Sequence, residues 1–294
     1  MIGGLYAGHL GRVCEVSVLC RRDEHTRALN EQGLRISGRH EFTTPVRAAT
    51  DPGELPEPEV AIVATKTTEL ESAAARLEGH WPTTAVMTVQ NGLGAEEAFA
   101  GRRVVSAVTF MSGTRHEDTH VEYILDTETW LGPYGETPYE LVEEIAALIV
   151  ASELKARPFR DLRPAQWSKL IFNATVNAVA ALTGLRHDPH FAARQQPTDL
   201  GNLVFDLVAE GKAVAAAAGV ELFEDPWEMN VLATQRGSAH YPSMLEDVDA
   251  HRRTEIDFIT GALVREAERL GVPVPLHTAM YRLVKAKEDS WNPN

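Results

Sequence analysis

The chain has 294 residues, of which 44% are hydrophobic and 24% are charged. This composition lies in the globular range and excludes disordered, collagen-like and disulfide-scaffold proteins. The 28 basic and 42 acidic residues give a formal net charge of −14 at pH 7, which argues against nucleic acid and anionic membranes as partners. The length predicts about two domains.

From its sequence we expect the chain to have no targeting or membrane segment. Its first residues lack the features of a signal peptide, and its longest apolar runs are far shorter than the roughly 18 to 20 residues of a membrane span. The two cysteines, Cys14 and Cys20, are too few to staple a secreted protein of this length. The sequence therefore predicts a cytoplasmic protein in which both thiols are reduced and buried.

Short, β-branched apolar runs alternate with helical segments in the first half. Four runs are predicted as strands buried on both faces: 15–20, 59–65, 84–89 and 104–110. Three segments are predicted as helices: 24–32, 68–78 and 95–100. This alternation is typical of a parallel, doubly wound sheet. Two further strands, 120–125 and 129–131, are expected as a hairpin or an edge before a helix at 139–151.

The second half is rich in Ala, Leu and Val and contains almost no strand-like run. Four long helices are predicted there: 165–182, 199–218, 255–270 and 278–288. A linker at 154–163 separates this region from the first half. We therefore expect an α/β domain over residues 1–155 and an all-helical domain over residues 156–294.

Gly3 and Gly4 suggest the end of a nucleotide-binding motif. In a Rossmann unit the last glycine of G-x-G-x-x-G opens the first helix, whose N-terminus binds the pyrophosphate. The strand and the glycine turn that normally precede this point would lie before Met1, and a frayed chain start is the alternative reading. We expect the working protein to extend about ten residues upstream, which is roughly what a strand and a turn require.

Polar residues follow three of the predicted strands. Arg21 and Arg22 follow the first, where basic residues suit the 2′-phosphate of NADP, although two solvated arginines are an equal alternative. Lys66 follows the second strand, and Gln90-Asn91-Gly92 follows the third. Asn-Gly alone is usually only a turn. Ligands bind beyond the carboxyl ends of strands in open α/β sheets, so these residues are expected at one crevice.

Lys169, Asn173 and Asn177 are spaced four residues apart in a segment that is otherwise apolar almost all round. On a helix they form one polar stripe. If the helix is buried, the stripe lines a cavity or finds partners, because an unpaired buried amide or ammonium costs several kcal/mol. The alternative is a stripe that faces solvent.

Two acidic motifs near the end of the chain are weaker signals. Ser243 with Glu246 fits a helix capping box, and capping alone is a sufficient explanation for Ser243. Glu255 is expected at the start of an amphipathic helix, where an acidic residue is ordinary.

His116-Glu117-Asp118-Thr119-His120 matches the zinc motif H-E-x-x-H. Its flanking residues are strand-like, whereas the motif binds zinc on a helix. We therefore predict no metal site.

These residues together resemble the ketopantoate reductase (2-dehydropantoate 2-reductase) family over nearly the whole chain. The resemblance rests on Ile2-Gly3-Gly4, Leu19-Cys20-Arg21, Thr65-Lys66, Gln90-Asn91-Gly92, Trp167-Ser168-Lys169-Leu170 with Asn173 and Asn177, Ser243-Met244-Leu245-Glu246-Asp247, and Thr254-Glu255-Ile256-Asp257. The blocks from the second half are the most specific in combination.

The resemblance implies an amino-terminal Rossmann domain that binds NADPH, a helical second domain and an active site in a cleft between them. It implies reduction of ketopantoate by hydride transfer, with Lys169 as the catalytic lysine that stabilises the developing oxyanion and delivers the proton. The substrate-binding positions that it implies are Asn173, Asn177, Ser243 and Glu255. The cofactor-binding positions are Gly3, Gly4, Arg21, Lys66 and Asn91.

Two other functions stay open. A related reductase could use a different 2-oxo acid, because pocket positions such as His240 and Tyr241 can change without affecting the lysine. Alternatively, a nucleotide-binding protein could have lost catalysis with its first strand. The role of His240 and the oligomeric state, with a homodimer as one option, are not fixed by the sequence.

Overall fold

The computed structural model describes residues 1–193, 198–235 and 241–291. The chain forms two compact units. The first contains Met1–Gln90 and Glu96–Leu162, and the second contains Asn91–Ala95 and Arg163–Asn294. His240, for which the sequence predicts no definite role, lies outside the described residues. Within the described ranges, no helix combines the length and the apolar character that a membrane span needs.

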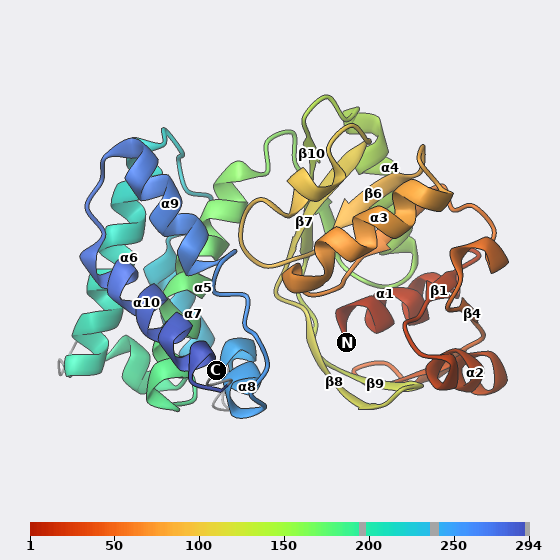
Figure 1. Ribbon diagram of the computed structural model, residues 1–294, viewed down its shortest axis with the longest axis horizontal. Helices are drawn as coiled ribbons and strands as arrows, with labels where there is room; N and C mark the ends of the chain where they lie inside the picture. The colour runs from red at the N-terminus through yellow and green to blue at the C-terminus, as the bar shows by residue number, and fades with distance from the viewer. Residues whose placement is uncertain (194–197, 236–240, 292–294) are drawn as a thin grey trace. The chain divides into compact units, whose positions relative to one another are not determined.

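A five-stranded sheet in the order β11-β10-β7-β6-β5 forms the centre of the first unit. Its strands are β5 (Val60–Val63), β6 (Ala85–Thr88), β7 (Val104–Thr109), β10 (Thr129–Tyr134) and β11 (Ala156–Pro158). β5, β6 and β7 are parallel, as their nearly continuous apolar sequences predict, whereas β10 is antiparallel to β7. The helices α3 (Leu70–His80) and α4 (Tyr139–Ala151) cover opposite faces of this sheet (Figure 1).

Two smaller sheets complete the first unit. β1 (Ser17–Leu19) pairs in parallel with β4 (Arg47–Ala49). The other sheet has the order β3-β2-β9-β8. Its strands are β2 (Leu34–Gly38), β3 (Phe42–Thr44), β8 (Ser112–Glu117) and β9 (His120–Leu125). Among the described residues, β1 and β5 therefore each have one edge without a strand partner. The helices α1 (Ile2–Leu10) and α2 (Asp23–Gln32) belong to the same unit.

Several local predictions for this half were wrong. Residues 120–125 and 129–131 do not form a hairpin, because β9 joins the four-stranded sheet whereas β10 lies between β7 and β11. Residues 95–100 contain a 3₁₀ helix, η3 (Ala95–Phe99), and the expected linker 154–163 contains β11. Cys14 is only half-buried, although both cysteines are free thiols as expected.

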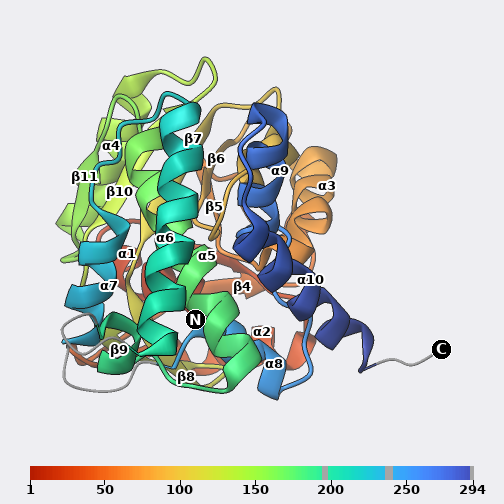
Figure 2. The same ribbon diagram turned by 90° about the vertical axis from the view of Figure 1, so that its left-hand side faces the viewer.

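The second unit consists of helices, which confirms the predicted α/β plus all-helical fold class. Its longest helix, α5 (Arg163–Thr183), contacts the other helices of the bundle (Figures 1 and 2). These are α6 (Asp199–Ala217), α7 (Pro226–Thr234), α8 (Ser243–Asp249), α9 (Thr260–Leu270) and α10 (Pro275–Asp289). α5 has buried residues all round, as a helix surrounded by others requires. Its central position brings its polar stripe into the interior of the unit.

Candidate active site

The polar stripe of α5 is buried. The exposed fractions are 8% for Lys169, 7% for Asn173 and 7% for Asn177, so the solvent-facing alternative is wrong. An ammonium group at such a position requires negative or acceptor groups nearby. We therefore expect polar or charged side chains from other segments of the helical unit to contact the stripe.

Two of these partners come from segments far away in the sequence. The amide nitrogen of Asn91 donates to a carboxylate oxygen of Glu255 at 3.3 Å, and the amide nitrogen of Asn173 donates to the side-chain oxygen of Asn91 at 3.4 Å. Glu255 also interacts electrostatically with Lys169. Lys169, Asn173, Asn91 and Glu255 thus converge, and we call them the Lys169 cluster.

Burial and the charge of Glu255 together determine the pKa of Lys169. Burial disfavours the ammonium form and lowers the pKa of Lys169 to about 8, while the negative charge of Glu255 acts in the opposite direction. A lysine with such a pKa is largely protonated at neutral pH yet gives up its proton far more readily than a surface lysine. This property is useful for a general acid.

Asn91 reaches the cluster because its loop is fastened to the helical unit. The backbone N–H of Leu93 donates to the carbonyl oxygen of Phe258 at 3.1 Å. Gly92 has φ +95°, and a Cβ at this position would overlap the same carbonyl oxygen. Gly92 is therefore required both for its backbone conformation and for the close approach of the two segments.

The structure corrects the expected settings of Glu255 and Ser243. Glu255 does not begin a helix, because α9 starts at Thr260 and Glu255 lies in the turns before it. Ser243 is the first residue of α8, whose N-cap is Pro242, and no side-chain cap hydrogen bond is formed there. A capping box therefore does not explain Ser243.

Two predicted substrate-binding residues are not linked to the cluster by hydrogen bonds. In the described part of the chain, neither Asn177 nor Ser243 has a side-chain hydrogen bond to any cluster member. Asn177 continues the stripe one helical turn after Asn173, whereas Ser243 is exposed. Their polar groups remain available to a ligand.

The predicted cofactor residues of the first unit gather at strand ends. Gly3 and Gly4 lie in the first turn of α1, where a Cβ at Gly3 would be 3.2 Å from the Cβ of Ala64, just after β5. Arg21 follows β1 and forms an ion pair with Glu69 at 3.1 Å. Lys66 precedes the 3₁₀ turn η2 (Thr67–Glu69) and is exposed.

Gln90 connects the end of β6 with the end of β5, although no separate role was predicted for it. Its amide nitrogen donates to the carbonyl oxygens of Val63 and Thr65 at 2.8 and 3.0 Å. Its side-chain oxygen is buried and has no hydrogen-bond partner among the described residues. Because such an acceptor is costly to leave unpaired, it fits a ligand that donates a hydrogen bond. Small residues at a helix start, a strand-end arginine and this acceptor together fit a dinucleotide.

Arg22 is engaged elsewhere. Its guanidinium donates to both carboxylate oxygens of Asp118 at 2.7 Å each. The side chain of Arg21 is 75% exposed and that of Glu69 is 42% exposed, so their ion pair is of the weak surface type. Of the two arginines, Arg21 is therefore the better suited to a ligand phosphate.

The H-E-x-x-H sequence lies on a β-hairpin. His116 is in β8 and His120 is in β9. The imidazole of His116 lies 2.8 Å from a carboxylate oxygen of Glu122, and that of His120 lies 2.7 Å from the hydroxyl of Ser37. Within the described residues, no group of three or more His, Cys, Asp or Glu side chains is arranged to hold a metal.

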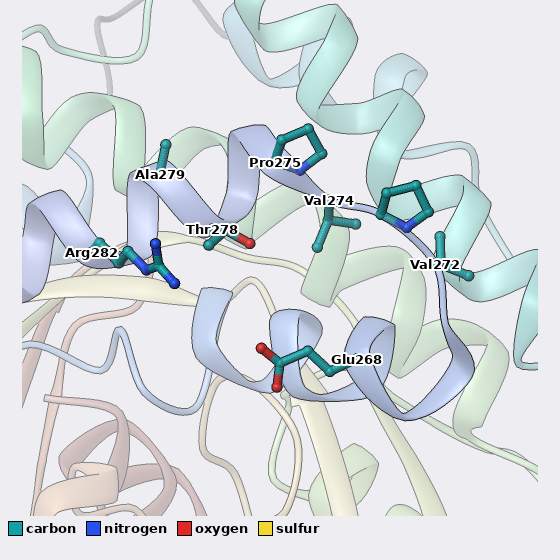
Figure 3. Close-up of a pocket in the computed structure, with 8 residues that line it drawn as sticks. Glu268, Val272, Val274, Pro275, Thr278, Ala279 and Arg282 are labelled. Atoms are coloured by element: carbon teal, nitrogen blue, oxygen red, sulfur yellow. The ribbon is translucent and has the colours of Figure 1, made fainter.

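An open cavity of about 530 Å³ lies where α9 connects to α10. Figure 3 shows Glu268 on one helix and Arg282 on the other, with Val274 and Pro275 at the start of the helix that carries Arg282. No residue predicted from the sequence as a site residue lines it. The cavity is therefore separate from the Lys169 cluster.

Family comparisons match both halves of the chain. The model described as ketopantoate reductase PanE/ApbA matches residues 1–136, and that of its C-terminal part matches residues 161–288. The 2-dehydropantoate 2-reductase of Pyrococcus horikoshii is 29% identical over 290 residues, which span 98% of this chain and 94% of the relative. That of Halobacterium salinarum is 29% identical over 97% of this chain and 94% of its own.

Solved structures show the same fold. The 2-dehydropantoate 2-reductase of Methylococcus capsulatus superposes with a TM-score of 0.86 at 26% identity, over 100% of this chain and 96% of its own. A D-mandelate dehydrogenase bound to NADH and anilino(oxo)acetate gives a TM-score of 0.86 at 22% identity, over 98% of this chain and 96% of its own. The second likeness concerns the fold alone.

Proposed function

Because the chain belongs to the ketopantoate reductase family, and is thus an oxidoreductase that acts on a 2-oxo acid, we propose that it reduces 2-dehydropantoate to pantoate with NADPH. The convergence of Lys169, Asn173, Asn91 and Glu255 supports this proposal most strongly. It provides a protonated amine, amide groups and a carboxylate at one place, which is the set of groups that reduction of a hydroxylated keto acid needs.

In this mechanism Lys169 stabilises the keto oxygen as negative charge develops on it and then donates its proton. Asn173, Asn177 and Ser243 hold the carboxylate and the hydroxyl of the substrate, which fixes the orientation of the ketone. Glu255 accepts a hydrogen bond from the substrate and favours the protonated form of Lys169. Bound NADPH supplies the hydride.

The first unit would supply most of the cofactor-binding residues. Gly3 and Gly4 at the start of α1 would accommodate the pyrophosphate, Arg21 would exchange Glu69 for the 2′-phosphate, and Lys66 and Asn91 would contact the remainder. We propose accordingly that residues 1–155 form the cofactor domain and 156–294 the substrate domain. A cytoplasmic location agrees with the free thiols.

Assays of the purified protein test the cofactor and the substrate together. We expect oxidation of NADPH with 2-dehydropantoate, a higher kcat/KM with NADPH than with NADH, and a lower one with 2-oxo acids that lack the hydroxymethyl group. Replacement of Arg21 by Ala should reduce the preference for NADPH, whereas Arg22→Ala, the matched control, should not. Faster turnover of another 2-oxo acid would identify a related reductase, and NADPH binding without turnover would contradict an enzymatic role.

The pH dependence of reduction should follow Lys169. Because the general acid must be protonated, kcat/KM should be level below pH 8 and fall above the pKa of Lys169, which is about 8. Replacing Glu255 by Gln removes the charge that raises this pKa, so the falling limb should move to lower pH by roughly one unit. Rate profiles of both proteins between pH 6 and 10 check this. If the falling limb of the profile lies at the same pH in Glu255→Gln as in the wild type, Glu255 does not raise the pKa of Lys169.

A further inference from the structure

We infer that Glu288 on the last helix, α10, is a positioning residue for Glu255 and acts through Thr254. This inference rests on the proposed function, since it explains how the carboxylate of the Lys169 cluster is held. Glu255 lies in a turn outside any helix, so its own segment does not fix its direction. Its neighbours in sequence are, however, hydrogen-bonded on both sides.

The first attachment precedes Glu255. One carboxylate oxygen of Glu288 accepts hydrogen bonds from both the backbone N–H and the hydroxyl of Thr254, each 2.7 Å long. Thr254 is 3% and Glu288 is 7% exposed, so these charge-assisted bonds are shielded from water. The same hydroxyl accepts from the backbone N–H of Ile256 at 3.2 Å, which closes the backbone around Glu255.

The second attachment follows Glu255. Asp257 accepts hydrogen bonds from the hydroxyl of Tyr281 at 2.7 Å and from the ammonium of Lys285 at 3.0 Å. Lys285 also lies 3.4 Å from Glu288. Partial burial would raise the pKa of Asp257, but these two hydrogen bonds, together with the positive charges of Lys285 and Arg265, hold the pKa below its usual value. Two points on α10 thus hold the segment from both ends.

The helix that makes these contacts is itself anchored. At its start, the carboxylate of Glu210 on α6 accepts from the backbone N–H groups of Leu276 and His277, both at 3.0 Å. The side chain of His277 is bonded to the carbonyl oxygen of Leu207 at 2.9 Å. α10 is therefore fixed on α6, and Thr254 relays that fixed position to Glu255.

The decisive measurement is the pKa of Lys169 in protein labelled with ¹³C at the lysine ε-carbons, without cofactor or substrate. Glu255→Gln should lower it, as derived above. Glu288→Ala should also lower the pKa of Lys169, by at least about half a pH unit, because a displaced carboxylate of Glu255 favours the ammonium form less. The double variant should titrate like Glu255→Gln alone. Merely weaker folding would not move the midpoint of the folded protein.

Activity provides a second readout. Glu288→Ala should lower kcat/KM by about tenfold or more, since misplacement of an orienting group costs rate without removing the chemistry. Glu288→Gln keeps a hydrogen-bond acceptor for Thr254 and should therefore retain most of the wild-type kcat/KM. Asp289→Ala, an exposed neighbour on the same helix, is the matched control and should behave like the wild type. If Glu288→Ala unfolds, Thr254→Val removes one of the two bonds and should shift the pKa of Lys169 in the same direction.

The outcomes separate the two proposals. If Glu255→Gln lowers the pKa of Lys169 and neither Glu288→Ala nor Thr254→Val does, the positioning role is wrong. If all of these variants shift the pKa but the wild type reduces no 2-oxo acid, the proposed function fails and the positioning of Glu255 by Glu288 stands.

Discussion

Replacement of Lys169 by Ala or Met should lower kcat by roughly 10² to 10⁴-fold while leaving NADPH affinity unchanged. Two contributions are lost together, the proton donor and the positive charge beside the developing oxyanion. Lys169 lies in the helical unit, whereas four of the five predicted cofactor residues, Gly3, Gly4, Arg21 and Lys66, lie in the other, so cofactor binding should persist. Single-turnover rates and the fluorescence of bound NADPH measure the two effects separately.

The Lys169→Arg variant shows which of the two contributions dominates. Arginine keeps the positive charge, but its pKa lies too high for efficient proton donation. We expect it to remain at least tenfold below the wild type. Added methylamine should partly restore turnover to Lys169→Ala and not to Lys169→Met, whose side chain fills the space.

An exposed lysine of the same unit serves as the control. Lys212 pairs with Asp225 at 2.6 Å on the surface, and Lys212→Met should retain full activity. Equal losses of turnover and of NADPH affinity in Lys169→Ala would contradict the assignment of Lys169 as the general acid.

The sequence predicted the helices α5, α6, α9 and α10 and the polar stripe of α5 because these follow strong, regular patterns, whereas the shorter helix α7 was missed. A spacing of four residues places Lys169 and Asn173 on one side of a helix wherever that helix lies. The sequence pattern could not, however, predict that Glu255 lies in a turn. The apolar residues around it fit the period of a helix, and the turn is stabilised by Thr254 and Glu288, which are far apart in sequence.

The short strands of the first unit were missed for a related reason. β8 has four exposed residues at its end, and β3 and β4 have only three residues each. Their pairing partners rather than their own composition stabilise them. Gln90 was recognised only as part of a motif, because its bonds to Val63 and Thr65 depend on how two strand ends meet.

Replacement of Gly92 by Ala should destabilise the protein by about 2 to 6 kcal/mol in total and lower kcat/KM by about a hundredfold. A residue with a Cβ at φ +95° is strained by roughly 1 to 3 kcal/mol. In addition, the new methyl group would overlap the carbonyl oxygen of Phe258, so one of the two segments must move, at a further cost of about 1 to 3 kcal/mol. Either movement breaks the bond from Leu93 and withdraws Asn91 from Glu255.

Gly101 separates the steric effect from the conformational one. It has a similar φ of +88°, but a Cβ there would meet no heavy atom of the described residues within 4 Å. Gly101→Ala should therefore show only the strain, about 1 to 3 kcal/mol, and retain its activity. Urea unfolding and steady-state rates compare the two variants.

Because Asn91, Glu255 and Lys169 are linked, Gly92→Ala should also change the pKa of Lys169 and Gly101→Ala should not. Equal behaviour of the two variants would mean that the contact with Phe258 does not position Asn91.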